Sequence, residues 1–256
     1  TNGYFDGIIH NVFVYNRALS PREIAQNYLA TKNPAPLSPV DGAVLDLRGT
    51  EGTNDPPTTV WQDASGEGNH GTLINFDNEG SGGWTEEGLS FNGVDDYVDC
   101  GNNASLAIAE QMTISAWFKP SLKTTIEPVI LYKNNEYLIR LEKTKTPRVL
   151  FYVYESESKW EPLLNSLQSI TLDEWHHVVA VWDENSVGSE MKLYVDNVKV
   201  ERSRTIVPTP TENSLRIGYW HNDDYFNGTI GDVRIYPKAL TDAEVLQNYL
   251  AGKKSP

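Results

Sequence analysis

The chain has a single cysteine, Cys100, no long apolar segment and few basic residues for its length. One cysteine excludes an intrachain disulfide. No apolar run reaches the roughly 20 residues that a membrane helix needs, so membrane insertion is not expected. The 35 acidic and 21 basic residues give a net charge of −14, which disfavours binding to the phosphates of nucleic acids or lipid head groups. The composition therefore favours carbohydrate or a cation as a partner.

Sequence signatures of several enzyme classes are also missing. The chain has no Cys-x-x-Cys or His-Glu-x-x-His spacing for zinc, no Gly-x-Ser-x-Gly nucleophile elbow and no glycine loop for phosphate. It begins at Thr1 without a signal-like segment. We interpret it as a mature or excised piece of a longer polypeptide.

One sequence occurs twice in the chain, 221 residues apart. Residues 4–30 and 225–251 share 14 identities in 27 aligned positions. Each copy has an alternating apolar strand pattern and then a Ser/Thr-x-x-Glu capping box, which begins at Ser20 in the first copy and at Thr241 in the second. Self-similarity at a fixed period indicates a tandem array. We therefore predict the end of one module followed by a complete second module.

Proline marks the boundary between the two modules. Residues 31–41 hold three prolines within six positions, which stiffens an extended connection and cannot continue a helix. We assign residues 1–33 to the terminal strand and helix of a preceding repeat, 34–41 to a linker and 42–253 to a complete domain. A strand without a sheet to cover it is marginal in water, so the first segment is not expected to fold alone.

Short apolar runs separated by turn residues dominate the complete module. Residues 112–118 and 191–195 alternate in character, so each strand has one apolar face to bury against another sheet. Asp196-Asn197 lies between two such runs and predicts a tight hairpin. The pattern predicts an all-β fold, namely a two-sheet antiparallel sandwich with a short C-terminal helix.

Six motifs of this module occur in the order found in one protein family. They are Asp63–Gly71 (DASGEGNHG), Phe91–Val98 (FNGVDDYV), Ile114–Phe118 (ISAWF), Trp175–Val178 (WHHV), Leu193–Asp196 (LYVD) and Phe226–Tyr236 (FNGTIGDVRIY). Together they resemble laminin-G-like domains of the concanavalin A-like lectin/glucanase superfamily, with pentraxins as relatives. The resemblance covers about residues 38–253. It implies a jelly-roll sandwich that takes ligands at its rim or on its concave face.

The resemblance to pentraxins implies a calcium site at the rim, where two loops meet and the ion holds the ligand. Calcium takes roughly six to eight oxygen ligands, and both loops are rich in carboxylates and amides. The predicted metal ligands are Asn135, Glu136, Asp223 and Asp224, and the predicted sugar contacts are Trp220, His221, Asn222 and Asn134. Alternatively, these asparagines and aspartates serve only as hairpin-tip residues that tolerate left-handed backbone.

A second predicted calcium site would tie the first and last strands together, as a buried ion does in similar sandwiches. The predicted ligands are Asp46, Asp63, Asn69 and Asp232. In the first copy of the repeat, Asn11 stands in place of Asp232, which keeps an oxygen but loses the charge. The alternative is that Asp232 caps a turn or forms an ion pair with Arg234 or Arg48.

Catalysis by the route of the superfamily's glucanases is not expected. Those enzymes carry three carboxylates on one strand, and retaining hydrolysis needs two carboxyls about 5 to 5.5 Å apart. The nearest stretch is residues 155–161, ESESKWE, in which the middle acid is glutamate and the third is displaced. We therefore predict no catalytic residues.

These patterns predict a non-catalytic, extracellular module for glycan binding or adhesion, assisted by calcium and drawn from a tandem-repeat surface or secreted protein. Its partner would be a carbohydrate or a cell-surface glycoprotein, and weak sites in tandem would gain avidity. One alternative is a structural subunit of a stalk, sheath or filament that self-associates, with the N-terminal segment pairing with a neighbouring chain. A second alternative is an accessory domain of a glycoside hydrolase.

Overall fold

The structure is a computed structural model. It describes residues 12, 14–20, 23–24, 27, 38–49, 59–77, 82–107, 110–121, 127–154, 164–186, 190–203, 210–221 and 224–253. In this part of the chain the strands form two antiparallel sheets, and the helix α2 (Asp242–Gly252) follows the last strand. The expected all-β sandwich with a short C-terminal helix is confirmed.

The last strand of the chain lies inside the first sheet rather than at its edge. This sheet runs in the order β14 (Val198–Ser203), β13 (Glu190–Val195), β12 (His176–Asp183), β7 (Gln111–Pro120), β16 (Asn227–Tyr236), β5 (Leu89–Asn92) and β4 (Gly83–Trp84), and β1 (Leu45–Leu47) also pairs with β16. β16 therefore has β7 on one side and both β5 and β1 on the other.

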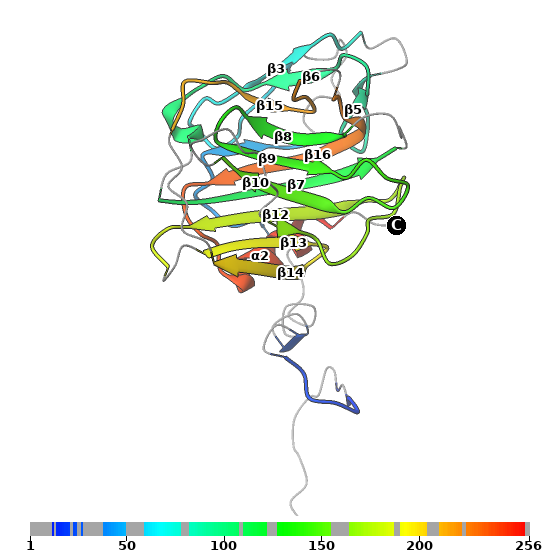
Figure 1. Cartoon of the computed structure of the whole chain (residues 1–256), viewed down its shortest axis with the longest axis vertical. Coiled ribbons are helices and arrows are strands. Elements are labelled where there is room, and N and C mark those ends of the chain that lie inside the picture. Colours follow the sequence, from blue (N-terminus) through cyan, green and yellow to red (C-terminus); the bar gives the residue numbers. More distant parts are fainter. Residues whose placement is uncertain are drawn as a thin grey trace, which may run out of the picture.

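The second sheet lies over the first, and Figure 1 looks through both layers. Its order is β11 (Leu164–Asn165), β10 (Val149–Val153), β9 (Tyr137–Leu141), β8 (Val129–Lys133), β15 (Leu215–Ile217), β6 (Tyr97–Asp99), β3 (Gly71–Ile74) and β2 (Val60–Trp61). A short 3-10 turn, η1 (Ala104–Leu106), follows β6.

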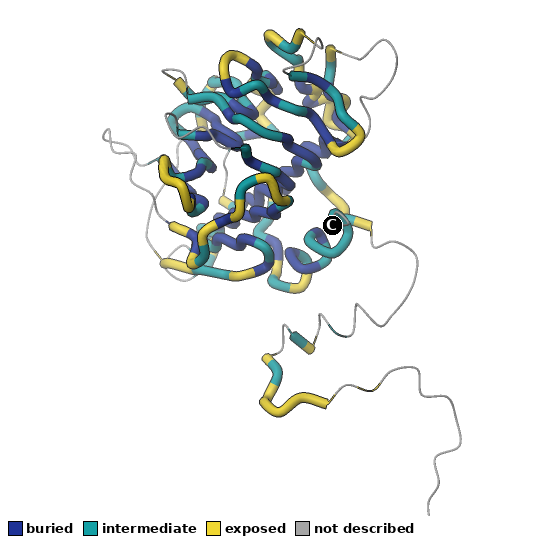
Figure 2. Tube along the Cα trace, turned by 90° about the vertical axis from the view of Figure 1, so that its right-hand side faces the viewer, coloured by how far each residue is buried: buried dark blue, intermediate teal, exposed yellow. Residues whose placement is uncertain are grey.

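The apolar core fills the space between the two sheets, where the tube in Figure 2 is mostly of the buried class. Trp182 of the first sheet and Trp61 and Phe151 of the second are among its largest side chains, and all three are inaccessible or nearly so. Because side chains alternate along a strand, the remaining residues of each strand face outward. The outward residues decide what each sheet presents to its surroundings.

Helix α2 covers the outer face of the first sheet. The apolar cluster there consists of Val179, Val181, Tyr194, Tyr236, Leu240 and Val245. The hydroxyl of Thr113 fixes the link before the helix, since it donates to the Lys238 carbonyl at 2.8 Å and accepts from the Leu240 N–H at 2.9 Å. The predicted capping box is present, with Thr241 and Glu244 satisfying each other's backbone N–H groups.

The tight hairpin predicted at Asp196-Asn197 is also confirmed. Val195 pairs with Val198, and the two residues between them have positive φ angles of 48° and 66°. Such left-handed backbone at both central positions matches the right-handed twist of the flanking strands. The short loop joins β13 to β14 at one edge of the first sheet.

Two buried groups make the stability of the fold depend on pH in opposite directions. Burial lowers the pKa of His177 to about 3, so acid favours the unfolded chain, which takes up this proton near its ordinary pKa of about 6.5. Burial raises the pKa of Asp96 to about 6, and the charges of Asp95 and Asp77 act in the same direction. Stability contributed by protonated Asp96 is therefore present at low pH and is lost as pH rises from about 4 to about 6.

Replacing Asp96 by Asn should isolate its contribution. The carboxylate is fully buried and accepts the Asn92 N–H at 2.8 Å through one oxygen, while its other oxygen has no hydrogen-bond partner. We expect Asp96→Asn to raise the free energy of unfolding at pH 7.5, by up to about 3 kcal/mol, because the neutral amide avoids burying a charge. The gain should shrink toward zero near pH 4 in urea unfolding curves measured at a series of pH values. A pH-independent difference would contradict this account.

Candidate functional site

A row of side chains crosses the outer face of the second sheet. Strand register pairs Tyr152 with Leu138, Leu138 with Tyr132, Tyr132 with Arg216 and Arg216 with Asp99. Residues directly opposite each other in an antiparallel sheet share a face, so all five lie on the face away from the core. Four strand spacings of about 4.8 Å give the row a length of roughly 19 Å.

The open part of this face carries a cluster of aromatic rings around one guanidinium. The Tyr219 ring stacks on Tyr225 at 4.5 Å between centroids and lies 5.2 Å from Tyr97. The Arg216 guanidinium lies over both Tyr97 and Tyr219, at 5.7 and 5.5 Å from the ring centroids. The Trp220 ring lies 5.9 Å from Tyr132 at the border of the cluster. We call Tyr97, Arg216, Tyr219, Trp220 and Tyr225 the aromatic patch; all five are partly exposed.

Backbone contacts hold the loop that carries the patch. A bridge joins Tyr219 to Tyr225, the Trp220 N–H donates to the Asp224 carbonyl at 3.3 Å, and one carboxylate oxygen of Asp224 accepts the Glu127 N–H at 3.2 Å. At the start of the loop, Gly218 has a φ of 85°, and a Cβ there would lie 2.5 Å from the Phe91 ring. Only glycine fits this position without displacing the core, so the start of the loop is fixed.

The tyrosines beside the patch keep their hydroxyl protons at neutral pH. Burial raises the pKa of Tyr132 and of Tyr152. The Tyr132 hydroxyl lies 2.5 Å from the side-chain oxygen of Asn134, and the Tyr152 hydroxyl accepts from Arg140 at 2.5 Å. Arg140 also pairs with Glu127 at 3.0 Å. Polar groups at this border are therefore held in place by one another.

At the predicted rim site, strand register decides where the described parts of the two loops lie. Antiparallel pairing sets Leu215 beside Lys133, whereas the Gly218 N–H donates to the Ile130 carbonyl. The loop after Lys133 therefore lies at one end of β15 and the loop after Gly218 at the other. This corrects the expectation that the two loops meet, because that expectation carried over a loop arrangement without knowing the strand register.

Glu136 is occupied inside the domain. Its carboxylate is fully buried and pairs with the Lys133 ammonium, and the backbone N–H and the hydroxyl of Thr211 both donate to it at 2.8 Å. The amide side chain of Asn213 donates to the Asn134 carbonyl at 3.0 Å, and Asn135 occupies the left-handed turn position with a φ of 59°. The geometry of the loop after Lys133 therefore fits the alternative in which its asparagines serve as hairpin-tip residues. Asn222 and Asp223 lie outside the described residues, and His221 is exposed.

At the second predicted site, arginine side chains provide the positive charge. The Arg234 guanidinium is almost fully buried and contacts Asp46 at 2.7 Å and Asp232 at 3.1 Å. Arg48 pairs with the other oxygen of Asp46 at 2.8 Å, and Asp232 also accepts the Gly49 N–H at 3.1 Å. This is the ion-pair alternative that the sequence left open. Two acids and two arginines balance in charge, so the geometry does not require a metal ion.

Asp63 and Asn69 organise the adjoining loop. Burial opposes ionisation of Asp63, but hydrogen bonds from the N–H groups of Asp46, Ser65 and Asn69 and from the Ser65 hydroxyl outweigh it and lower its pKa. The Asn69 amide donates to the Val44 carbonyl at 2.7 Å. Among the described residues, no group of three or more His, Cys, Asp or Glu side chains is placed to hold a metal. Calcium binding therefore remains a prediction of the resemblance.

Sequence reasoning identified Trp220 but missed Tyr97, Arg216, Tyr219 and Tyr225. Alternation along β6 and β15 places Tyr97 and Arg216 on the outer face, and this signal was available in the sequence. Their contact with each other depends on strand register, which the sequence does not reveal. The acidic stretch 155–161 lies outside the described residues.

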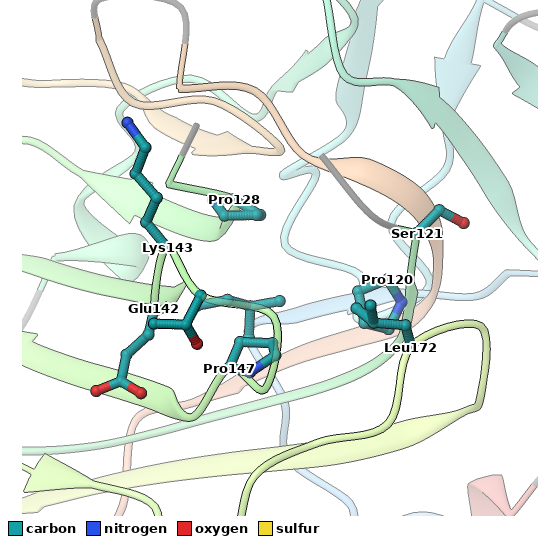
Figure 3. Close-up of a pocket in the computed structure, with 9 residues that line it drawn as sticks. Pro120, Ser121, Pro128, Glu142, Lys143, Pro147 and Leu172 are labelled. Carbon is teal, nitrogen blue, oxygen red and sulfur yellow. The ribbon is translucent and has the colours of Figure 1, made fainter. Parts of the chain in front are cut away.

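A small surface pocket lies between the end of β7 and the β9–β10 hairpin (Figure 3). Pro120, Pro128 and Pro147 form much of its wall, and there is room for little more than a water molecule. The Glu142 carboxylate projects away from Pro120 (Figure 3) and pairs with Arg148 at 2.7 Å. This pocket is too small for a sugar ring.

The two antiparallel sheets and the terminal helix define a jelly-roll sandwich of the concanavalin A-like type. The chain belongs to the Concanavalin A-like lectin/glucanases superfamily, whose laminin G model matches residues 92–246. This confirms the resemblance that the motifs indicated. No curated protein matches the chain.

Solved structures show the same fold at low sequence identity. Domain 4 of AbnA, an extracellular GH43 arabinanase from Geobacillus stearothermophilus in complex with arabinotriose, is 21% identical with a TM-score of 0.58, over 82% of this chain and 98% of that one. The ligand binding domain of botulinum neurotoxin serotype D, in complex with N-acetylneuraminic acid, is 17% identical with a TM-score of 0.59, over 82% and 50%. A Trypanosoma rangeli sialidase is 17% identical with a TM-score of 0.60, over 90% and 38%. The chain thus spans nearly all of the first structure and half or less of the others.

Removing Arg234 should show how much the buried ion pairs matter. Arg234→Met leaves Asp46 with the half-exposed Arg48 and Asp232 with the Gly49 N–H, and breaking a buried ion pair costs about 3–5 kcal/mol. We expect a loss of that size in the free energy of unfolding from urea denaturation. The matched control, Arg148→Met, breaks the more exposed pair with Glu142 and should cost less than about 1 kcal/mol. Equal losses in the two variants would contradict the assignment.

Proposed function

We propose that this chain is a non-catalytic carbohydrate-binding module whose ligand platform is the aromatic patch. The observation that carries the proposal is the gathering of Tyr97, Tyr219, Trp220 and Tyr225 around Arg216 on an outward face. Aromatic rings offer flat apolar surface to the C–H faces of a sugar, while their polar edges and the guanidinium can meet its hydroxyl groups.

The comparisons support a sugar as the class of ligand. Two neighbours in the same fold were solved with arabinotriose and with N-acetylneuraminic acid. At 21% and 17% identity they establish the fold of this chain rather than its ligand. They nevertheless supply the two probes, one neutral and one anionic, with which to examine the patch.

A non-catalytic role is supported by the engagement of the acids at the predicted sites. Glu136 is paired with Lys133, and Asp46 and Asp232 share Arg234. A glycosidase needs one carboxylate free to attack or to activate water and another free to donate a proton. None of these three acids is available for either role.

We also propose an extracellular or cell-surface setting, with a glycan or glycoprotein as the partner. The net charge of −14 supports this, because it disfavours nucleic acid and anionic lipid as partners. One neighbour is a domain of an extracellular arabinanase. Within the described residues, no helix is long and apolar enough to cross a membrane.

Removing rings from the patch should weaken sugar binding without unfolding the domain. We expect Tyr219→Ala and Trp220→Ala each to weaken binding of the preferred probe by about tenfold or more, since truncating a central aromatic contact costs at least about 1.4 kcal/mol. Isothermal titration calorimetry with arabinotriose and with N-acetylneuraminic acid measures this.

The matched control for those variants is Trp175→Ala. Trp175 is also partly exposed and also has a cation over its ring, Lys119 at 5.7 Å, but it precedes β12 of the other sheet. Its removal should leave sugar affinity unchanged. If Trp175→Ala weakens binding as much as Trp220→Ala does, the patch is not the platform.

Calcium assistance is a separate part of the proposal and has its own test. Among the described residues of the loop after Gly218, Asp224 is the predicted ligand; its carboxylate accepts the Glu127 N–H at 3.2 Å and lies 3.9 Å from the His221 ring. An ion held by this loop would order the patch, because a ligand of the folded state stabilises it. We expect calcium to raise the melting temperature and EDTA to reverse the rise. An unchanged melting temperature together with intact sugar binding would show that the patch binds sugar without calcium.

A further inference from the structure

The N-terminal copy of the repeat makes the same local hydrogen bonds as the C-terminal copy. The Ser20 N–H donates to Glu23 at 2.8 Å, and the Thr241 N–H donates to Glu244 at 2.8 Å. The return bonds, from the glutamate N–H to the hydroxyl, are 3.3 Å long in both copies. The same glutamate pairs with a basic residue six positions earlier in each copy. The predicted capping box is therefore present twice.

A second contact ties the strand to the helix in both copies. The Asn27 amide donates to the Tyr15 hydroxyl at 2.9 Å, and the Asn248 amide donates to the Tyr236 hydroxyl at 3.1 Å. In the complete domain, Tyr236 ends β16 and Asn248 lies in α2. The N-terminal segment thus carries the side chains that fix a terminal helix against a terminal strand.

The two copies differ sharply in burial. Val12, Val14 and Ile24 are 71%, 91% and 57% exposed, whereas their counterparts Val233, Ile235 and Val245 are 0%, 1% and 0% exposed. In the complete domain these positions face the core or the outer face of the first sheet. The described residues between 12 and 27 lie outside the sandwich in both views (Figure 1, Figure 2). Their apolar surface is therefore uncovered here.

We propose that residues 4–30 are the closing strand and helix of a second β-sandwich of this family. The docking surface is formed by Val12, Val14 and Ile24. It docks on a sandwich that has no last strand of its own at the central position that β16 holds in the complete domain. The internal copy supports this choice, because it shows what covers the same residues when they are buried: β7, β5 and β1 around the strand, and the outer sheet face beneath the helix. The sandwich of residues 38–253 cannot serve, since β16 already fills its central place.

The sequence differences between the copies specify the chemistry of that second sandwich. Phe13 stands at the position of Arg234, and Asn11 at that of Asp232. In the complete domain Arg234 neutralises the buried carboxylate of Asp46. A segment with phenylalanine at this position has no cation to offer, so the second sandwich carries a neutral or apolar residue where Asp46 stands here.

Grafting tests the proposal in the full chain. In the graft, residues 225–251 are replaced by the sequence of residues 4–30, with arginine restored in place of its phenylalanine. We expect one cooperative thermal transition, because the segment fits the place of β16 and α2. In this graft, the substitution Val14→Asp should abolish that transition or lower its midpoint by more than about 5 °C. Aspartate at the grafted Asn16, an exposed link position, should leave it unchanged. Loss of cooperativity in the graft, or equal tolerance of both aspartates, would overturn the proposal.

The unmodified graft, which keeps Phe13, provides a second test, in which we compare the direction of a change in melting temperature between two chains. In the parent chain Asp46→Asn removes an ion pair and should lower the melting temperature. In the unmodified graft Asp46 lacks its arginine partner from the last strand, so Asp46→Asn should raise the melting temperature or restore a transition that is missing. If Asp46→Asn changed the melting temperature in the same direction in both chains, the grafted strand would not have the register of β16.

Sedimentation of the parent chain separates the proposed occupant from a second copy of the same chain. We expect a monomer at every concentration, since the central place of each copy is filled by its own β16. A concentration-dependent dimer that Val14→Asp dissolves would show that a second copy receives the segment, and would overturn the choice of occupant.

Discussion

The central position of β16 is the constraint on which the rest of this structure depends. It pairs with β7, β5 and β1, so strands from the start, the middle and the end of the domain meet only when the last strand arrives. It also carries Arg234, the shared partner of Asp46 and Asp232, into the same layer. Such non-local pairing carries a loop-closure cost, so we expect the central strand to join the sheet late in folding.

Among the described residues, helix α2 covers the outer face of the first sheet and not that of the second. On the first sheet α2 buries an apolar cluster, so this face is part of the stable body of the domain. On the second sheet the outward residues of β6 and β15 remain partly exposed, and their aromatic rings gather around Arg216. The acids at the predicted calcium sites, by contrast, are largely engaged by lysine, arginine or backbone N–H groups. The proposed recognition of carbohydrate by aromatic rings and a guanidinium is consistent with this division of charge.

Local sequence signals allowed much of the fold to be predicted. Contacts that depend on strand register could not be predicted. The hairpin at Asp196-Asn197 and the capping boxes depend on residues a few positions apart, and the structure confirms them. The meeting of the loops after Lys133 and Gly218 was wrongly expected, because antiparallel pairing places them at opposite ends of β15. The pairing of Arg234 with Asp46 was one of two alternatives, and no local pattern could decide between an ion pair and a metal.

The repeated strand and helix show how local and non-local stabilisation differ in size. The N-terminal copy keeps its capping box and its Tyr15–Asn27 contact without any sheet around it. Hydrogen bonds of this kind contribute only about 0.5–1.5 kcal/mol each, and less at an exposed helix end. Burying Val12, Val14 and Ile24 would add about 1.5–3 kcal/mol for each side chain. Local bonds therefore set the shape of this unit, but most of its stability would have to come from docking on a sheet, and the proposed docking place is the one that β16 holds in its own sheet.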